Sequence, residues 1–137
     1  FTDLAVDKRP PLAKRTLRDT GMVQYEVAQA EARIRAARAF VLSELSDIWQ
    51  EVVATKALSI ANRMRIRLAT TFAIHEAKAA ADTAYDLAGA TAIFIGNVFE
   101  RRFRDMHTVT QQQQGRKAHL QTVGAFLLGL PPDLDIV

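Results

Sequence analysis

The segment that decides the fold is residues 21–89, whose sequence is GMVQYEVAQAEARIRAARAFVLSELSDIWQEVVATKALSIANRMRIRLATTFAIHEAKAAADTAYDLAG. Between its terminal glycines it contains neither Gly nor Pro, and all 4 prolines of the chain lie outside it, at positions 10, 11, 131 and 132. Strands need turn residues about every 8–12 positions, so a segment of this length without them excludes a β-fold. It predicts two long helices joined by a short polar connection.

The spacing of apolar residues predicts the first of these helices, from a cap at Asp19 or Thr20 to about residue 51. Apolar side chains recur every three or four positions, which is the period of one helix face. This face carries Val23, Val27, Ala30, Ile34, Ala37, Val41, Leu45 and Ile48. We expect the face to lie against the core.

The second long helix is predicted from about residue 59 to 87, with Gly89 in the left-handed conformation that ends many helices. One face is apolar around Met64 and Leu68, and a second face is rich in alanine. Small side chains allow helices to approach closely, so we expect contacts on two sides, one of them with a second subunit.

Shorter elements are expected on either side of this pair. Residues 1–5 are typical of the last turn of a helix, which indicates a C-terminal fragment of a longer polypeptide. An apolar loop is expected over 90–97, a short helix over 98–107 and an amphipathic helix over 117–128. The predicted architecture is all-α: a single domain over residues 1–137, an antiparallel up-and-down four-helix bundle with two long and two shorter helices.

Composition narrows the class of protein further. With 137 residues, 49% apolar and 24% charged, the chain has the composition of one soluble domain. The absence of cysteine excludes disulfides and thiolate metal sites, and mildly favours the cytoplasm. No apolar run approaches the ~20 residues that span a bilayer, so no membrane segment is predicted. The net charge of +3 is nearly balanced, and we expect the aromatic residues mostly on buried helix faces, which predicts no nucleic-acid binding.

Motifs of known chemistry are sparse. His75, His107 and His119 are isolated, so no metal site is predicted. No serine lies in a glycine-flanked elbow, and the 6 glycines are too dispersed for a phosphate loop. Residues 104–112 gather ionisable and amide groups near the end of a short helix. Taken alone, these residues fit either a polar helix end or a site.

One stretch carries a family resemblance. Residues 98–108, VFERRFRDMHT, together with 87–93, LAGATAI, resemble the C-terminal helical domain of the acyl-CoA dehydrogenase superfamily, in its flavin-dependent hydroxylase and monooxygenase branch. Residues 18–40 are also similar to the first helix of that domain. The resemblance implies a flavin, FAD or alternatively FMN, bound with the help of domains absent from this chain. It also implies self-association into a dimer or tetramer.

The resemblance implies a cofactor turn. Gly89, Ala90 and Thr91 match the family's turn whose backbone approaches the flavin diphosphate of a neighbouring subunit. Backbone N–H groups beside a glycine can bind an anion closely, which fits this role. From the residues alone, the same glycine also fits a simple helix end.

The resemblance also implies catalytic positions after an Arg104-Asp105 ion pair that we expect to be structural. The catalytic glutamate of the dehydrogenases falls at Gln113, and the catalytic histidine of hydroxylase relatives falls at Gln112. An amide cannot act as a general base near pH 7, so His107 is the titratable candidate in the motif. We therefore assign the catalytic positions to His107, Gln112 and Gln113.

Three functional hypotheses result. In the first, the chain is the oligomerisation and site-closing domain of an acyl-CoA dehydrogenase-like oxidoreductase, inactive in isolation, whose substrate is an acyl-CoA. In the second, the parent enzyme is a flavin-dependent hydroxylase acting on an aromatic small molecule. In the third, the chain is a non-enzymatic helical interaction module.

Overall fold

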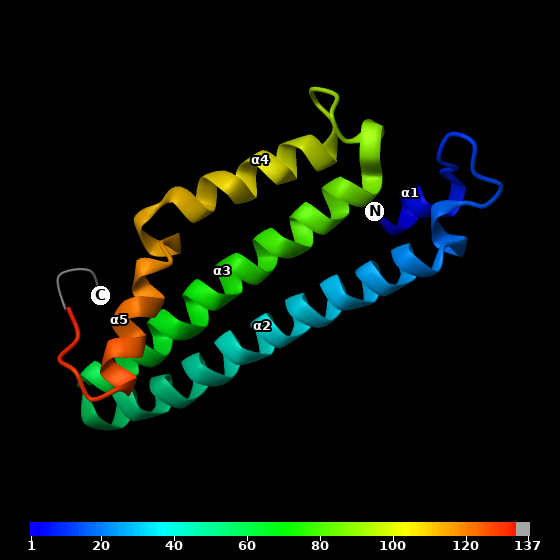
Figure 1. The fold of residues 1–137 in the computed structure, drawn as a ribbon. Helices are drawn as coiled ribbons and strands as arrows, with labels where there is room; N and C mark the ends of the chain where they lie inside the picture. The colour runs from blue at the N-terminus through cyan, green and yellow to red at the C-terminus, as the bar shows by residue number, and fades with distance from the viewer. Residues whose placement is uncertain (134–137) are drawn as a thin grey trace.

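The computed structural model describes residues 1–133, and in this part of the chain every regular element is helical. Short 3-10 helices lie between most of the successive α-helices, whereas α3 follows α2 without one (Figure 1). In chain order they are α1 (Thr2–Asp7), η1 (Leu17–Asp19), α2 (Gly21–Thr55), α3 (Ile60–Ala88), η2 (Gly89–Thr91), α4 (Val98–Gln111), η3 (Gln113–Gly115) and α5 (Ala118–Leu127). The predicted all-α fold is confirmed.

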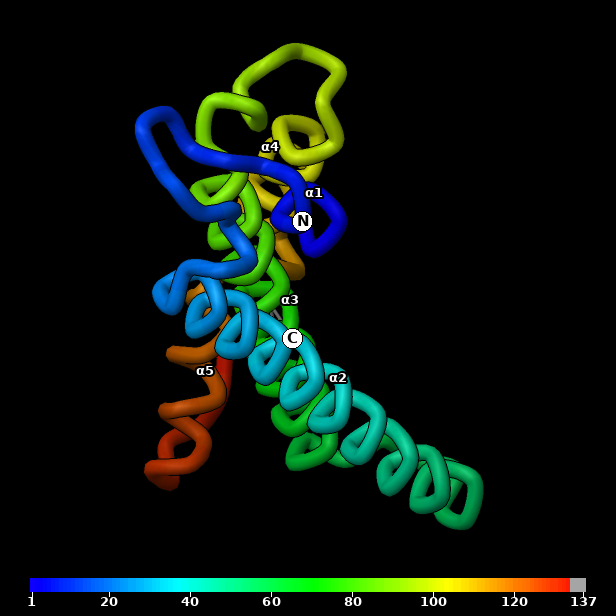
Figure 2. Tube along the Cα trace, turned by 90° about the vertical axis from the view of Figure 1, so that its right-hand side faces the viewer, coloured from blue at the N-terminus to red at the C-terminus, as the bar shows by residue number. Residues whose placement is uncertain are grey.

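Helix α3 is the centre of the molecule. It packs against α2 on one side and against α4 and then α5 on the other. Figure 1 shows α3 between α2 and α4, and the turned view of Figure 2 shows α3 between α2 and α5. Helices α4 and α5 therefore follow each other along one side of α3. Both predicted sides of α3 are contacted, and within the described residues both contacts come from the same chain.

The ends of the long helices show how local chemistry sets their lengths. Helix α3 begins as predicted, because the Ser59 hydroxyl accepts the Asn62 N–H at 3.2 Å. Helix α2 begins directly after Thr20, although no side chain makes the predicted capping hydrogen bond there. It extends beyond the predicted end to Thr55 and stops at Lys56, whose backbone is left-handed with φ 57°. Gly89 has the expected positive φ of 54°, but its ψ of −142° differs from the left-handed helical value.

The buried surface of α2 is narrower than its apolar pattern predicts. Val23, Ala37 and Ile48 are buried, whereas Ile34 and Leu45 are exposed. The reason is that a single helix, α3, runs along most of α2 and covers only a strip of it.

The placement predicted for the aromatic residues is wrong at four positions. Trp49 and Tyr25, on α2, are 70% and 60% exposed, and Phe72, on α3, and Phe94, in the loop before α4, are exposed as well. A helix with one neighbour leaves apolar side chains exposed, and towards its C-terminal end α2 does so at Leu42, Leu45, Trp49 and Val53, which share one side of the helix. We call this set the outer face of α2. No helix within residues 1–133 combines the length and apolar content that a membrane span requires.

Candidate active site

The residues assigned to cofactor binding and to catalysis lie at opposite ends of α4. Gly89, Ala90 and Thr91 form η2 directly after α3, and the loop that follows leads into the start of α4. Gln112 and Gln113 lie in the connection between α4 and α5, residues 112–117, which we call the elbow. Helix α4 has 14 residues, which at about 1.5 Å each separates its two ends by roughly 20 Å. His107 therefore lies near the elbow, and both lie far from the turn at residues 89–91.

The turn at residues 89–91 is held by a residue from the start of the chain. The Lys8 ammonium donates one hydrogen bond to the Ala88 carbonyl oxygen and another to the Thr91 hydroxyl, the latter at 2.5 Å. A cation at this place satisfies a free carbonyl at the C-terminus of α3 and interacts favourably with the helix dipole. Sequence reasoning missed Lys8, because 80 positions separate it from Ala88 and no local signal links them.

The surroundings of Gly89 are open. Gly89 and Ala90 are exposed, and a Cβ added at Gly89 would have no atom within 4 Å. The glycine is therefore required by its positive φ and not by a close neighbour in this part of the chain. An exposed turn beside an ammonium group can receive an anionic group from outside.

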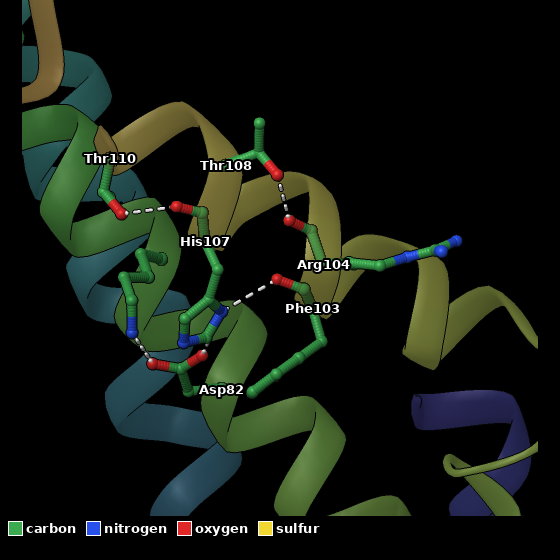
Figure 3. A network of polar contacts seen from close by, with 7 residues as sticks. Asp82, Phe103, Arg104, His107, Thr108 and Thr110 are labelled. Carbon is green, nitrogen blue, oxygen red and sulfur yellow. Dashed lines mark hydrogen bonds and ion pairs between the residues drawn. The ribbon is translucent and has the colours of Figure 1, made fainter. Parts of the chain in front are cut away.

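His107 lies on α4 and faces α3 (Figure 3). Its Nδ1 is 2.8 Å from the Phe103 carbonyl oxygen, which can only accept a hydrogen bond. Nδ1 therefore carries a hydrogen in the neutral ring, and Nε2 is the nitrogen that can accept a proton. The ring also stacks on Phe103, with ring centroids 4.0 Å apart, and Phe103 in turn stacks on Tyr85 at 4.4 Å.

A carboxylate from α3 completes the surroundings of His107. Asp82 Oδ1 lies 3.7 Å from His107 Nδ1, while Asp82 Oδ2 accepts a hydrogen bond from the Lys78 ammonium at 2.5 Å. Oδ1 is buried and has no hydrogen-bond partner within the described residues. The separation of 3.7 Å is too long for a hydrogen bond but suits an ion pair when the ring is protonated. Asp82 was not singled out from the sequence, since nothing nearby in the chain pairs it with a histidine.

A cleft of about 410 Å³ opens next to Asp82, between α3 and the end of α4. All but one of the residues that line it carry a polar or charged side chain, and they include both members of the Lys78–Asp82 pair. The residues that line it are His75, Lys78, Ala79, Asp82, Thr110, Gln111 and Lys117. Gln112 and Gln113 do not line the cleft but are exposed at the elbow, directly after Gln111 of its lining. Within residues 1–133, no three side chains of the metal-binding types gather into a group that could hold a metal ion.

The predicted Arg104–Asp105 ion pair is wrong. Arg104 pairs with Glu100, at 3.2 Å between Nε and Oε1, and Asp105 lies 3.8 Å from both Arg101 and Arg102. Neighbouring residues on a helix point in different directions, whereas residues three or four positions apart share a face.

Helix α4 also continues past the predicted end at residue 107 to Gln111. The Thr108 hydroxyl bonds the Arg104 carbonyl, and the Thr110 hydroxyl bonds the His107 carbonyl, each at 2.9 Å. Residues 108–111 are therefore the last turn of α4 and not a loop.

Comparison with known proteins identifies the family. Residues 1–116 match the family described as acyl-CoA dehydrogenase, C-terminal domain, and the chain belongs to this family. The resemblance found in residues 87–108 is thereby confirmed. Among similar proteins is an indole-3-acetate monooxygenase of Acinetobacter baumannii, 31% identical over 132 residues, which are 96% of this chain and 34% of that protein.

Two further proteins extend the comparison. An indole-3-acetate monooxygenase of Pseudomonas putida is 32% identical over 129 residues, which are 94% of this chain and 32% of that protein. The crystal structure of 3-HSA hydroxylase from Rhodococcus sp. RHA1 has the same fold, with a TM-score of 0.79 and 24% identity over 88% of this chain and 32% of that one. The chain therefore spans about a third of the length of the curated relatives it matches.

Proposed function

We propose that this chain is the C-terminal helical domain of a flavin-dependent monooxygenase that hydroxylates an aromatic small molecule. The observation that carries the proposal is the similarity of nearly the whole chain to two proteins that are named monooxygenases. The positions that match the catalytic glutamate of the dehydrogenases and the catalytic histidine of the hydroxylases, Gln113 and Gln112, are both amides, which cannot take up a proton near pH 7. His107 is therefore the titratable residue that this stretch offers to the reaction.

The exposed turn at residues 89–91 is the part of this chain suited to the flavin diphosphate. The backbone at Gly89 has open space around it, and the Lys8 ammonium is fixed beside it. Both features fit a diphosphate, which FAD has and FMN lacks, so FAD is the proposed cofactor. When bound, the reduced flavin supplies two electrons to O₂, so that one oxygen atom enters the substrate and the other leaves as water.

His107 is the proposed proton-transfer residue. Its Nδ1 hydrogen is directed at the Phe103 carbonyl and lies near Asp82, which leaves Nε2 to exchange a proton with the substrate hydroxyl. Gln112 and Gln113 are exposed at the elbow one turn further on, where their amides can form hydrogen bonds with the substrate. Each amide both donates and accepts, which suits a polar substituent of an aromatic molecule.

The outer face of α2 is the proposed surface for self-association into a dimer or tetramer. Its exposed apolar side chains lie three or four positions apart between Leu42 and Val53, along the C-terminal part of a helix of 35 residues. Contiguous apolar surface of this kind is typical of subunit interfaces.

The test uses the intact protein that contains this domain, supplied with FAD, a flavin reductant, O₂ and indole-3-acetate as a trial aromatic acid. We expect a visible flavin spectrum and a product that has gained one oxygen atom, measured by mass spectrometry with ¹⁸O₂. Failure to take up flavin would contradict the proposal. Oxidation of a short-chain acyl-CoA without oxygen incorporation would instead support the dehydrogenase hypothesis, and salt-sensitive binding of a protein partner without flavin would support the interaction module.

A further inference from the structure

The elbow between α4 and α5 is held by two histidines that the sequence shows only as isolated residues. His75, on α3, places its Nε2 at 2.9 Å from the Gly115 carbonyl oxygen. His119, on α5, places its Nε2 at 2.5 Å from the Gln113 carbonyl oxygen. Two side chains from different helices thus converge on the single turn of η3.

The partners of these histidines define their hydrogen positions. A backbone carbonyl can only accept a hydrogen bond, so each ring carries a hydrogen on Nε2. His119 is only 1% exposed, and its Nδ1 has no hydrogen-bond partner within the described residues. Within the described residues the His119 side chain therefore makes one hydrogen bond, the one to the elbow, and its burial keeps water from competing for the Gln113 carbonyl.

The elbow backbone packs closely against α4 at Gly115. Gly115 is buried, and a Cβ added there would lie 2.6 Å from the Val109 carbonyl oxygen and 3.1 Å from the Thr110 Cα. The turn is therefore packed against the last turn of α4 on one side while the two histidines bind its carbonyl groups.

The side chains of the elbow differ from its backbone. Gln112, Gln113 and Gln114 are all exposed, so the fixed backbone presents amide groups outward. Accurate placement of a binding group requires a rigid support, because small displacements weaken directional hydrogen bonds.

We propose that His75 and His119 are positioning residues, which fix the elbow backbone so that Gln112 and Gln113 meet the substrate in a defined geometry. This proposal rests on the proposed monooxygenase function. The two histidines act through the backbone of η3, in contrast to His107, whose Nε2 is assigned to the substrate itself.

The test compares removal of the donor with its replacement. His75→Leu and His119→Leu remove the N–H group, whereas His75→Gln and His119→Gln retain an amide N–H at a similar reach. The first measurement is hydrogen exchange at the amides of residues 112–116 in the intact protein. We expect the leucine variants to exchange on the order of tenfold faster there, as loss of one hydrogen bond implies, and the glutamine variants to recover most of the protection.

The second measurement is product formation by the intact, flavin-loaded protein. The leucine variants are expected to raise KM and to lower the fraction of reduced flavin that yields hydroxylated product, with flavin uptake unchanged and with recovery in the glutamine variants. His75 is only half-buried, so His75→Leu should disturb folding less than His119→Leu. Thermal unfolding measures any loss of stability in His119→Leu. Gln29→Leu, which removes an exposed donor on α2, is the control and should leave elbow exchange unchanged.

Two outcomes would overturn the proposal: wild-type exchange at the elbow in both leucine variants, or faster exchange with unchanged KM and product yield. If the wild-type protein forms no hydroxylated product, the proposed function fails. Elbow exchange then decides by itself whether the histidines hold the turn.

Discussion

The turn after α3 and the elbow after α4 both contain a glycine, yet each glycine is there for a different reason. At the turn, Gly89 has a positive φ and open space around it. At the elbow, Gly115 has no room for a Cβ, because the Val109 carbonyl is already in contact. The elbow is therefore shaped by its own chain, whereas the turn presents an open surface to a group from outside.

The two regions also differ in what holds them. One ammonium, that of Lys8, binds the turn through the Ala88 carbonyl and the Thr91 hydroxyl. Two histidines from α3 and α5 bind the elbow. This difference matches the proposed division of labour, in which the turn binds a large cofactor and the elbow orients a small substrate.

The largest expected effect tests which end of α4 hosts the chemistry. Replacing His107 with alanine should lower the rate of hydroxylation about 100-fold, because a positioned proton donor typically contributes 10²–10⁴-fold. Flavin uptake should not change, since the turn at residues 89–91 lies at the far end of α4. Single-turnover product formation and flavin titration measure the two quantities separately. A rate within a few-fold of wild type would remove His107 from the site.

The two glycines allow a direct comparison of packing with backbone strain. Gly115→Ala should lower the free energy of unfolding by about 2 kcal/mol, because the added methyl group must displace backbone atoms. Gly89→Ala should cost about 1 kcal/mol, through its positive φ alone. Urea denaturation of the two variants measures the difference. A larger loss at Gly89 than at Gly115 would reverse our account of the two turns.

Lys8 offers the complementary test at the turn. Lys8→Met should weaken flavin binding about tenfold, since hydrogen bonds made by a charged group are worth about 1.5–3 kcal/mol each and their loss frees the turn. The hydroxylation rate at saturating flavin should stay near wild type. Lys14→Met, at an exposed position, is the matched control. Equal flavin affinity in the two variants would separate Lys8 from cofactor binding.

The smallest expected effect concerns pH and the segment that carries Lys8. The Thr16 hydroxyl, 2.6 Å from Asp19 Oδ2, holds the pKa of Asp19 below its ordinary value, with Arg18 and Arg15 adding to this effect. A lowered folded-state pKa stabilises the fold above the unfolded-state value of about 4, and this contribution is lost as the pH falls through the folded-state value.

The measurement for this prediction is hydrogen exchange along the chain at about pH 3–6. Acid should loosen residues 16–20 before the elbow, because η1 contains Asp19 and the Leu17 N–H binds the Lys8 carbonyl at 2.9 Å. Thr16→Val should reduce the acid-dependent increase in hydrogen exchange at residues 16–20. Simultaneous loosening of the elbow would indicate that the two regions are not independent.

Much of the fold could be predicted because helices depend on near neighbours. The absence of Gly and Pro between residues 21 and 89, the Ser59 cap and the apolar spacing all act within a few residues, and α2 and α3 follow from them. The predicted burial of side chains was wrong where it depended on how many helices pack against α2. The exposed Ile34 and Leu45 lie on a face that periodicity marks as apolar, but periodicity does not say how many helices will cover it.

The candidate site was predictable only in part. The family motif in residues 98–108 led to His107, Gln112 and Gln113, but their supports lie elsewhere in the chain. Asp82 is 25 positions before His107 and approaches it only because α3 and α4 pack together. The predicted Arg104–Asp105 ion pair was wrong for the opposite reason, because the side chains of adjacent residues on a helix point in different directions.

The sequence by itself determined the two long helices, the start of α3 at Ser59 and the family, because each of these depends on residues close together in the chain. Only the tertiary structure decided that Lys8 binds the turn, that Asp82 faces His107 and that His75 and His119 bind the elbow. These contacts join positions from different segments, and their geometry exists only once α3 has packed between its neighbours.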